Sequence, residues 1–371
     1  MPSAVFLIHL DENHGFILKK RHPISLKVTE ADLNNIYVPH AEKAGLHVIE
    51  LDDTQILSYS KNKMPEWVVC FEMEADDDIS FESSRLEGTA RLLLELAETS
   101  IDDIDLEEIM KSGSSLSEES AEQKFAGVFL TPSAPLILEH LQSAEISGFV
   151  SSAALSMWLK KQVGGEGTNV AEAIRPLITS GLVKMEMLTK TKQFVFLVKD
   201  VFGHRASPND SLKLAEMTRP DIYEEYKEQV ENFFGADSSG RGYNPTIMEE
   251  EEMQTMIEDR EKVAVNVANI IHYNVITALR KGPMTLDEII IQTAFPKSIV
   301  QKALWALKSN SIVTSFEEES IWALLTDPVF ESFMPKYVLE GISKKWNTKE
   351  ADSAEVQMYL DLLINTWRTT S

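Results

Sequence analysis

The sequence predicts an α+β protein of several domains: an N-terminal antiparallel sheet with the element order ββαβββα, two helical modules that each end in a β-hairpin, and a long connecting helix. Three observations lead to this prediction. The chain has 371 residues, enough for two to four domains at roughly 100 to 200 residues each. Apolar runs of strand length alternate with turns over residues 1–100. Helical spacing of apolar residues dominates after residue 126.

The first expected domain, residues 1–100, opens with a hairpin. Residues 4–10 and 16–22 are β-rich apolar runs, and the turn between them contains Gly15, which can adopt a positive φ. Thr29 and Asp32 have the spacing of a helix N-cap pair, which predicts a helix after residue 29. Three further strands and a closing amphipathic helix are expected at 46–51, 55–61, 66–74 and 86–97.

The first helical module follows an acidic segment. Residues 101–125 are rich in Ser, Asp and Glu, and we expect a linker that buries little of its surface. Residues 126–205 then form the module itself. Its three helices are expected at 135–141, 151–163 and 169–181, and its two β-runs at 182–188 and 193–202.

Residues 206–262 are expected to be an acidic helical connector, with a helix at 220–234 and a flexible loop at 235–245. A single long helix is predicted from residue 247 to residue 281. At 1.5 Å per residue it would be about 50 Å long, enough to bridge modules or to pair with a second copy of the chain as a homodimer. The apolar stripe that predicts this helix consists of Met253, Ile257, Ala264, Val267, Ile271 and Val275.

The second helical module is expected over residues 263–327. Gly282 and Pro283 end the long helix. Shorter helices at 285–293 and 297–309 and β-runs at 311–316 and 320–325 complete the module. The C-terminal part, residues 328–371, is expected to add two helices, at about 328–343 and 350–368.

The opening hairpin, VFLIHLDENHGFILKKRHP, together with the ββαβββα order, resembles a longin or roadblock-type domain. The two later modules, with three helices followed by a β-hairpin, resemble winged-helix domains. The combination resembles the nitrogen permease regulator-like subunits and uncharacterised archaeal proteins of similar layout. This resemblance implies a scaffold that acts with small GTPases rather than a metabolic enzyme. Winged helices in sorting-complex adaptors likewise bind protein.

Charge and cysteine content argue against several classes of protein. The net charge is −24, from 59 acidic and 35 basic residues, which disfavours a general affinity for nucleic acid or for an anionic membrane. The excess acid lies in residues 1–125 and 206–262, whereas the two modules are close to neutral. The one cysteine, Cys70, lies in an apolar run, so we expect it to be buried and unreactive. With no apolar run of about 20 residues and no signal-peptide pattern, we expect no membrane span and a cytoplasmic location.

A search for catalytic and ligand-binding motifs predicts no enzymatic activity, no cofactor and no metal. The stretch from Gly164 to Thr168 is rich in glycine but follows a helix and lacks the lysine of a phosphate-binding loop. No His-x-x-x-His or Gly-x-Ser-x-Gly motif is present. His9 and His14 flank a turn beside Asp11, and we interpret them as solvated side chains rather than as metal ligands.

Arg21 is the one residue with a speculative catalytic role. It lies in Lys19-Lys20-Arg21-His22, on the second strand of the opening hairpin. An exposed arginine could complete the active site of a partner GTPase as an arginine finger. The alternative interpretation is an edge strand kept soluble by its charges.

Lysines on the two modules are the candidate contacts to DNA or to a partner protein. In DNA-binding winged helices the third helix enters the major groove and the hairpin touches phosphate. The hairpin region of the first module is basic, with Lys184, Lys190, Lys192, Lys199 and Arg205, while its third helix is not. The second module has a basic third helix but the acidic hairpin Glu317-Glu318-Glu319. The candidate contacts are Lys160, Lys161, Lys190, Lys192, Lys297, Lys302 and Lys308.

These observations favour a non-enzymatic adaptor or regulatory scaffold that binds protein partners, with a small GTPase as the first candidate. The alternative is a transcription regulator that binds DNA through its winged helices.

Overall fold

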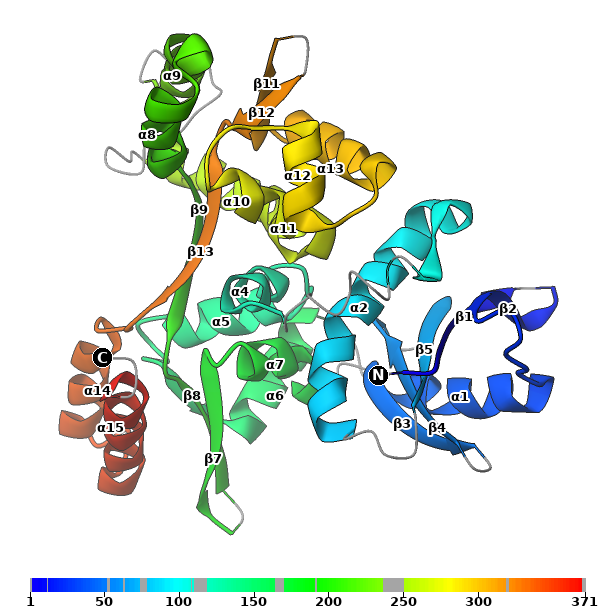
Figure 1. The fold of residues 1–371 in the computed structure, drawn as a ribbon. Helices are drawn as coiled ribbons and strands as arrows, with labels where there is room; N and C mark the ends of the chain where they lie inside the picture. The colour runs from blue at the N-terminus through cyan, green and yellow to red at the C-terminus, as the bar shows by residue number, and fades with distance from the viewer. Residues whose placement is uncertain are drawn as a thin grey trace. The chain divides into compact units, whose positions relative to one another are not determined.

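The computed structural model describes residues 2–11, 13–51, 54–62, 64–73, 79–107, 109, 119–163, 170–190, 192–235, 250–317 and 320–368. Helices and small antiparallel sheets make up the fold (Figure 1). The chain forms two compact units. The first contains residues 1–120 and 287–301, and the second contains residues 121–286 and 302–371. No helix in the described ranges is both long and apolar enough to cross a lipid bilayer.

The sheet of the first unit has the predicted element order, and all of its neighbouring strands are antiparallel. Its five strands lie in the order β2-β1-β5-β4-β3, so the opening hairpin forms one edge. The elements are β1 (Ala4–Asp11), β2 (Gly15–His22), α1 (Glu30–Glu42), β3 (Gly45–Leu51), β4 (Thr54–Ser60), β5 (Trp67–Met73) and α2 (Ile79–Ser100).

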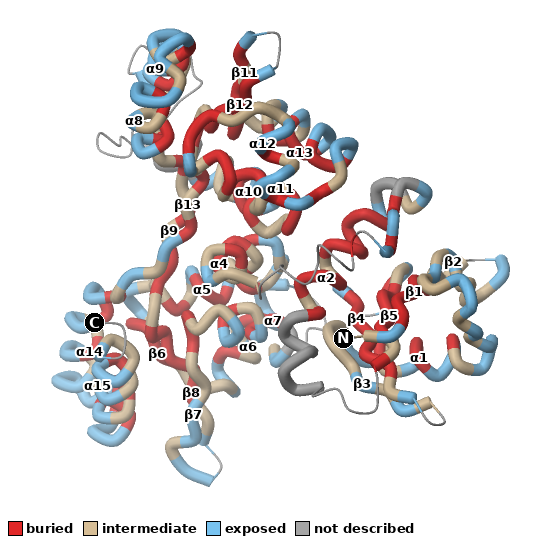
Figure 2. The backbone as a smooth tube through the Cα atoms, viewed as in Figure 1, coloured by how far each residue is buried: buried red, intermediate tan, exposed pale blue. Residues whose placement is uncertain are grey.

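Helices α1 and α2 pack against this sheet. Phe6 of β1 and Cys70 of β5 share a cluster with Leu33 and Ile36 of α1, whereas α2 packs along β4 and β5. Because successive strand residues point to opposite faces, the buried Leu7 lies on the face away from Phe6. Figure 2 shows the resulting buried strands. Cys70 is buried as expected, and burial raises the pKa of its thiol.

From residue 134 onward the chain passes twice through the same element order, αβααβββαα. The first half consists of α5 (Ala134–Gln142), β6 (Phe149–Ser151), α6 (Ser152–Val163), α7 (Val170–Thr179), β7 (Val183–Thr189), β8 (Lys192–Leu197), β9 (Asp200–Ala206), α8 (Asn209–Thr218) and α9 (Pro220–Phe234). The second half consists of α11 (Ile270–Leu279), β10 (Met284–Thr285), α12 (Leu286–Thr293), α13 (Lys297–Ser309), β11 (Val313–Phe316), β12 (Ile321–Leu324), β13 (Asp327–Phe333), α14 (Val338–Asn347) and α15 (Ser353–Arg368). Helices α4 (Ala121–Val128) and α10 (Glu250–Ala268) precede the two halves.

Matching hydrogen bonds show which positions of the two halves correspond. The amide of Leu182 donates to the carbonyl of Leu177 at 3.0 Å, and the amide of Ile312 donates to the carbonyl of Leu307 at 2.9 Å. The turn from α7 into β7 therefore matches the turn from α13 into β11.

The start of the last strand in each half is also held in the same way. The side chain of Gln142, the last residue of α5, donates to Oδ1 of Asp200 at 2.8 Å. The Arg280 side chain, after the last turn of α11, donates to Oδ1 of Asp327 at 2.8 Å. Asp200 and Asp327 are the first residues of β9 and β13, so the halves correspond from helix to strand.

Strands β9 and β13 pair antiparallel over their whole length and join the two halves (Figure 1). The helices that follow β9 and β13 in the sequence each pack on the opposite half. Helices α14 and α15 pack on the β6-β8-β7 sheet of the first half, while α8 and α9 pack on β11 and β12 of the second. Tyr359 donates to the carbonyl of Leu197 at the end of β8, and Tyr226 donates to that of Leu324 at the end of β12, each at 2.7 Å. The two helices that follow each half's last strand in the sequence therefore pack on the sheet of the other half.

Helix α10 belongs to the core of this second unit. Val263, Ala264 and Val267 of α10 are fully buried in a cluster with Phe125 of α4 and Phe330 of β13. The described part of the expected connector 206–262 is also packed, because Ala215, Ile222 and Tyr226 of α8 and α9 are buried in a cluster with β11 and β12.

The single long helix predicted for 247–281 is wrong. The structure has α10 and α11, with Asn269 between them. The Asn269 side chain accepts a hydrogen bond from the amide of His272 and caps α11, which explains the break. The stripe expected to bridge modules or to pair with a second copy is buried within the chain at Ala264, Val267, Ile271 and Val275. Residues 247–249 lie outside the described residues.

The helix expected at 328–343 is also wrong. The segment begins with β13, in which buried residues alternate with exposed or half-buried ones, and the helix α14 starts only at Val338. The β-run expected at 193–202 is divided into β8 and β9. Helix α8 was not expected.

The expected linker 101–125 is partly packed. Ile104, Leu106 and Ile109 are buried, and α4 begins at Ala121. The serine-rich part and most of the loop 235–245 lie outside the described residues.

Candidate partner-binding surface

Arg21 lies on β2, the outermost strand of the first sheet, opposite Phe6 of β1. Its side chain is exposed, and Nη1 donates to the carbonyl of Leu26 at 2.9 Å. The register between β1 and β2 shifts so that Lys19 has no partner residue, which is a β-bulge. Lys20 donates to the backbone after α2. A bulge and charged side chains are common protections of an edge strand, so this arrangement fits both interpretations of Arg21.

The candidate lysines of the first half differ in exposure and in their contacts. Lys160 and Lys161 are exposed near the end of α6, and Lys190 is exposed in the turn after β7. Lys192 forms an ion pair with Glu355 of α15 at 2.5 Å. The hydrogen bond to Glu355 raises the pKa of Lys192. Lys192 therefore helps to hold α15 against the sheet of the first half.

Two further bases of that hairpin region also serve the fold. The ammonium of Lys199 lies 5.8 Å from the ring centroid of Trp367, next to the end of α15. Arg205, which is only 4% exposed, forms an ion pair with Asp259 of α10. Arg205 was expected among the basic residues of the hairpin region, but it lies in the interior.

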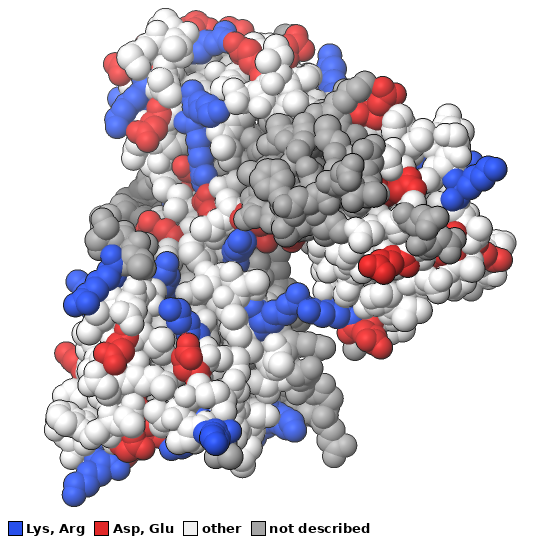
Figure 3. All heavy atoms as spheres, turned by 60° about the horizontal axis from the view of Figure 1, so that its bottom comes forward, with Lys and Arg blue, Asp and Glu red and all other residues white. Residues whose placement is uncertain are grey.

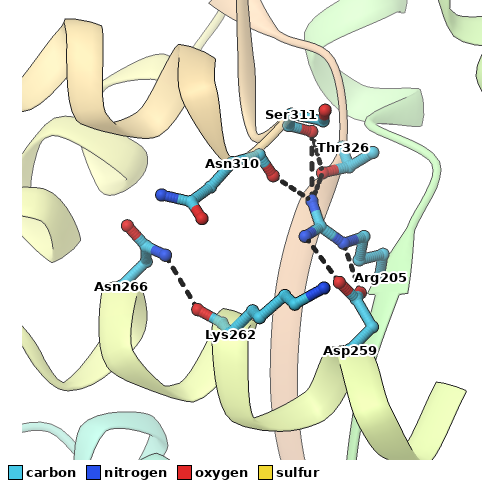
Figure 4. A network of polar contacts seen from close by, with 7 residues as sticks. All are labelled: Arg205, Asp259, Lys262, Asn266, Asn310, Ser311 and Thr326. Atoms are coloured by element: carbon cyan, nitrogen blue, oxygen red, sulfur yellow. Dashed lines mark hydrogen bonds and ion pairs between the residues drawn. The ribbon is translucent and has the colours of Figure 1, made fainter.

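Figure 4 shows how Arg205 joins four segments of the second unit. Its Nε and Nη2 donate to the carboxylate of Asp259 at 2.5 and 3.0 Å. Its Nη1 donates to the carbonyls of Asn310 and Ser311 at 2.9 and 3.1 Å, and to Oγ1 of Thr326 at 3.0 Å. A guanidinium with five such bonds is a structural connection between the halves, and it is not available to phosphate.

Helix α13 of the second half carries the remaining lysines. Lys297 and Lys302 are exposed and Lys308 is partly buried. At about 100° per residue, Lys297 and Lys308 point in nearly the same direction, while Lys302 lies about 120° from Lys308. The three lysines thus border the exposed side of the helix. No Asp or Glu occurs in α13.

Trp305 lies in the middle of that exposed side and is 50% exposed. Lys308 Nζ is 5.1 Å from the Trp305 ring centroid and 5.5 Å from that of the buried Trp322 on β12. It also donates to Oγ of Ser315 on β11 at 2.8 Å. The two indole rings meet edge to face with centroids 6.1 Å apart. This cluster fixes one side of Trp305 and leaves the other side open to solvent.

The corresponding helix of the first half provides an internal comparison. Ala173, Ile174 and Leu177 of α7 are buried, as are the matching Ala303, Leu304 and Leu307 of α13. At the positions of Lys302, Trp305 and Lys308, however, the first half has Glu172, Arg175 and Ile178. The fold therefore repeats the inward residues and not the outward ones. We infer that the packing of the half does not require the tryptophan and the two lysines.

Trp305 is not among the candidate contacts predicted from the sequence, which are all lysines. Val300, Leu304 and Leu307 follow each other at steps of four and three, whereas Trp305 is displaced by one residue from Leu304. That displacement is the signal that could have identified it as outward-facing.

Other side chains of the kinds that bind metals or transfer protons make contacts within the fold. His14 Nδ1 is 2.9 Å from Asp11 Oδ1, and His9 Nε2 is 2.9 Å from Glu66 Oε1. Among the described residues there is no group of three His, Cys, Asp or Glu side chains that could hold a metal ion. The predicted glycine-rich turn from Gly164 to Thr168 lies outside the described residues.

Basic and acidic side chains are interspersed on the face drawn in Figure 3. The described residues of that face form no broad area of a single charge sign. Such a mixture is ordinary for a protein surface and offers no broad basic area to a phosphate backbone.

No protein-family model and no curated protein sequence matches the chain.

Proposed function

We propose that the chain is a non-enzymatic regulatory scaffold that binds protein partners. In this proposal residues 1–100 form a longin-like domain, and the two halves of the chain from residue 134 onward are winged-helix domains. Support comes from the ββαβββα order with its antiparallel sheet and from the repeated helix and hairpin order.

The proposal is carried by the half-exposed Trp305 on α13, together with the internal contacts made by the basic hairpin residues of the first half. In the first half, Lys192, Lys199 and Arg205 are engaged in internal contacts. A phosphate backbone would have to compete with those contacts. In the second half, Trp305 on α13 is half-exposed, and exposed aromatic residues are enriched at protein interfaces.

The experiment is affinity capture of the tagged full chain from a lysate of the source organism, with and without nuclease treatment. The proposal expects stoichiometric protein partners that survive nuclease and high salt washing. Recovery of nucleic acid alone, with every co-purifying protein lost on nuclease treatment, would refute it.

A small GTPase is the partner class that the longin-like resemblance favours for the first unit. If Arg21 acts as an arginine finger, Arg21→Ala should reduce stimulated GTP hydrolysis by that GTPase about 1000-fold or more. Lys19→Ala, a neighbouring exposed charge on the same strand, is the matched control. Unchanged stimulation by the Arg21→Ala protein would exclude the finger while leaving a docking role intact.

DNA binding is the second candidate, and one observation favours it. The exposed side of α13 carries Lys297 and Lys302, and the helix contains no acidic residue. If this helix reads DNA, the full chain should shift a duplex with an affinity that falls steeply as salt rises. Absence of a shift at low salt would remove this candidate.

A further inference from the structure

We propose that the surface formed by Lys302, Trp305 and Lys308 binds an acidic peptide segment that carries an aromatic or aliphatic side chain. The proposal rests on the scaffold function above and names the chemistry of one partner. The apolar side chain packs on the open side of the indole ring, and carboxylates pair with the two lysines.

The spacing of the three residues suits such a ligand. Lys302 and Lys308 stand three residues before and three residues after Trp305, so both are its neighbours on the helix surface. A segment centred on the indole ring therefore meets a cation in each direction along α13.

The anchor is preorganised. Lys308 is held by Ser315 and lies against both Trp305 and Trp322. Trp322 is only 4% exposed, so its ring supports Trp305 from below. A fixed indole ring loses little conformational entropy on binding, which is a property of residues that dominate interface energies.

The internal comparison separates this surface from the needs of the fold. The corresponding residues of the first half, Glu172, Arg175 and Ile178, have different charges and shapes, although the buried residues of the two helices match. The tryptophan and its two lysines are therefore specific to the second half.

A peptide fits this surface better than duplex DNA does. A duplex that accepts a winged helix contacts both the third helix and the hairpin. The hairpin between β11 and β12 has the sequence Glu317-Glu318-Glu319, and Glu317 is exposed. Phosphate would be repelled there, whereas a single peptide segment can lie on α13 alone.

The probe is a random 12-residue peptide library displayed on phage and selected against the purified full chain. We expect the selected peptides to be enriched in Asp and Glu around one aromatic or aliphatic residue. Selection of basic peptides, or of none that bind, would overturn the inference. Binding of a 20-base-pair duplex that depends on the same three residues would also overturn it, in favour of DNA.

Variants test whether selected peptides use this surface. Trp305→Ala should weaken binding of a selected peptide about tenfold, and Lys302→Glu about fivefold, because a central aromatic anchor and its charged neighbour are lost. Lys302 is exposed, so its variant reports on binding even if Trp305→Ala is poorly folded. Trp346→Ala, at a tryptophan 55% exposed on α14, and Lys160→Glu on α6 are the matched controls. Equal affinities for all four variants would refute the proposed surface.

The two proposals can fail separately. Nuclease-resistant partners captured without any peptide selectivity for the Trp305 surface would leave the scaffold intact and refute the acidic peptide. The opposite outcome is that selected acidic peptides bind in a way that requires Trp305, while the chain captures no protein from the lysate. That outcome would support the peptide site and refute the scaffold.

Discussion

Replacing Arg205 with alanine should destabilise the second unit by about 3 to 5 kcal/mol, the usual cost of removing one partner of a buried ion pair. The substitution leaves the Asp259 carboxylate without its cation, and that side chain is only 19% exposed. It also leaves the carbonyls of Asn310 and Ser311 without the donor that they share. Because Asp259 keeps some contact with water, we expect a value near the lower end, about 3 kcal/mol.

The assay is urea unfolding of the full chain, combined with hydrogen exchange of the amides in β9 and β13. The two strands pair with each other, so exchange there reports whether the halves stay joined. Lys213→Ala is the control, because Lys213 pairs with Asp210 on the surface and should cost at most about 0.5 kcal/mol.

The double variant Arg205→Met with Asp259→Leu removes both charges together. It should recover most of the lost stability, since an apolar pair avoids the unpaired carboxylate. A loss below about 1 kcal/mol for Arg205→Ala, the range of an exposed salt bridge, would refute the reasoning. Unchanged exchange in β9 and β13 would refute it as well.

Three further predictions concern buried positions. Gly148→Ala should lower the melting temperature far more than Gly181→Ala, since both have positive φ but a Cβ on Gly148 would lie 2.1 Å from Oη of Tyr359; equal effects would contradict this contact. Burial, aided by the nearby His47, lowers the pKa of His40 to about 4, so the first unit should lose about 2 kcal/mol between pH 7 and pH 5 as the unfolded histidine protonates. The His40→Gln protein should not show this loss, as measured by amide hydrogen exchange in β4 at the two pH values. The same pH dependence in the unaltered protein and in His40→Gln would argue against this role of His40. Tyr226→Phe should cost about 1 to 2 kcal/mol in urea unfolding, because the carbonyl at the end of β12 loses its buried donor; no change would contradict that role.

The first hundred residues could be predicted well from sequence because their signals are local. Alternating apolar runs, the turn at Gly15 and the cap formed by Thr29 and Asp32 each act within a few residues. The structure contains the capping box at Thr29 and all five strands. Helices 151–163 and 220–234 were predicted within one residue of α6 and α9 for the same reason.

The joining of the halves could not be predicted, because it depends on pairing between distant segments. β13 was expected as a helix, and its strand conformation is stabilised by β9, more than 100 residues earlier in the chain. Likewise, the break at Asn269 is a cap in the middle of a continuous apolar stripe, and periodicity alone does not reveal it.

The candidate surface was predicted in part. The lysines of α13 were identified from the sequence, because the charge of a residue is known without a structure. The roles of Lys192 and Arg205 were not, since their partners Glu355 and Asp259 are far away in the sequence. The outward position of Trp305 depends on how the helix is rotated against its half, which only packing decides.

Photo-crosslinking from position 305 tests the central claim most directly. A photoreactive phenylalanine analogue would replace Trp305 in the full chain, and in a control chain it would replace Trp346. After irradiation in cells of the source organism, we predict a nuclease-resistant protein adduct from position 305 that is absent from position 346. An adduct to nucleic acid at position 305, or the same adducts from both positions, would contradict the account.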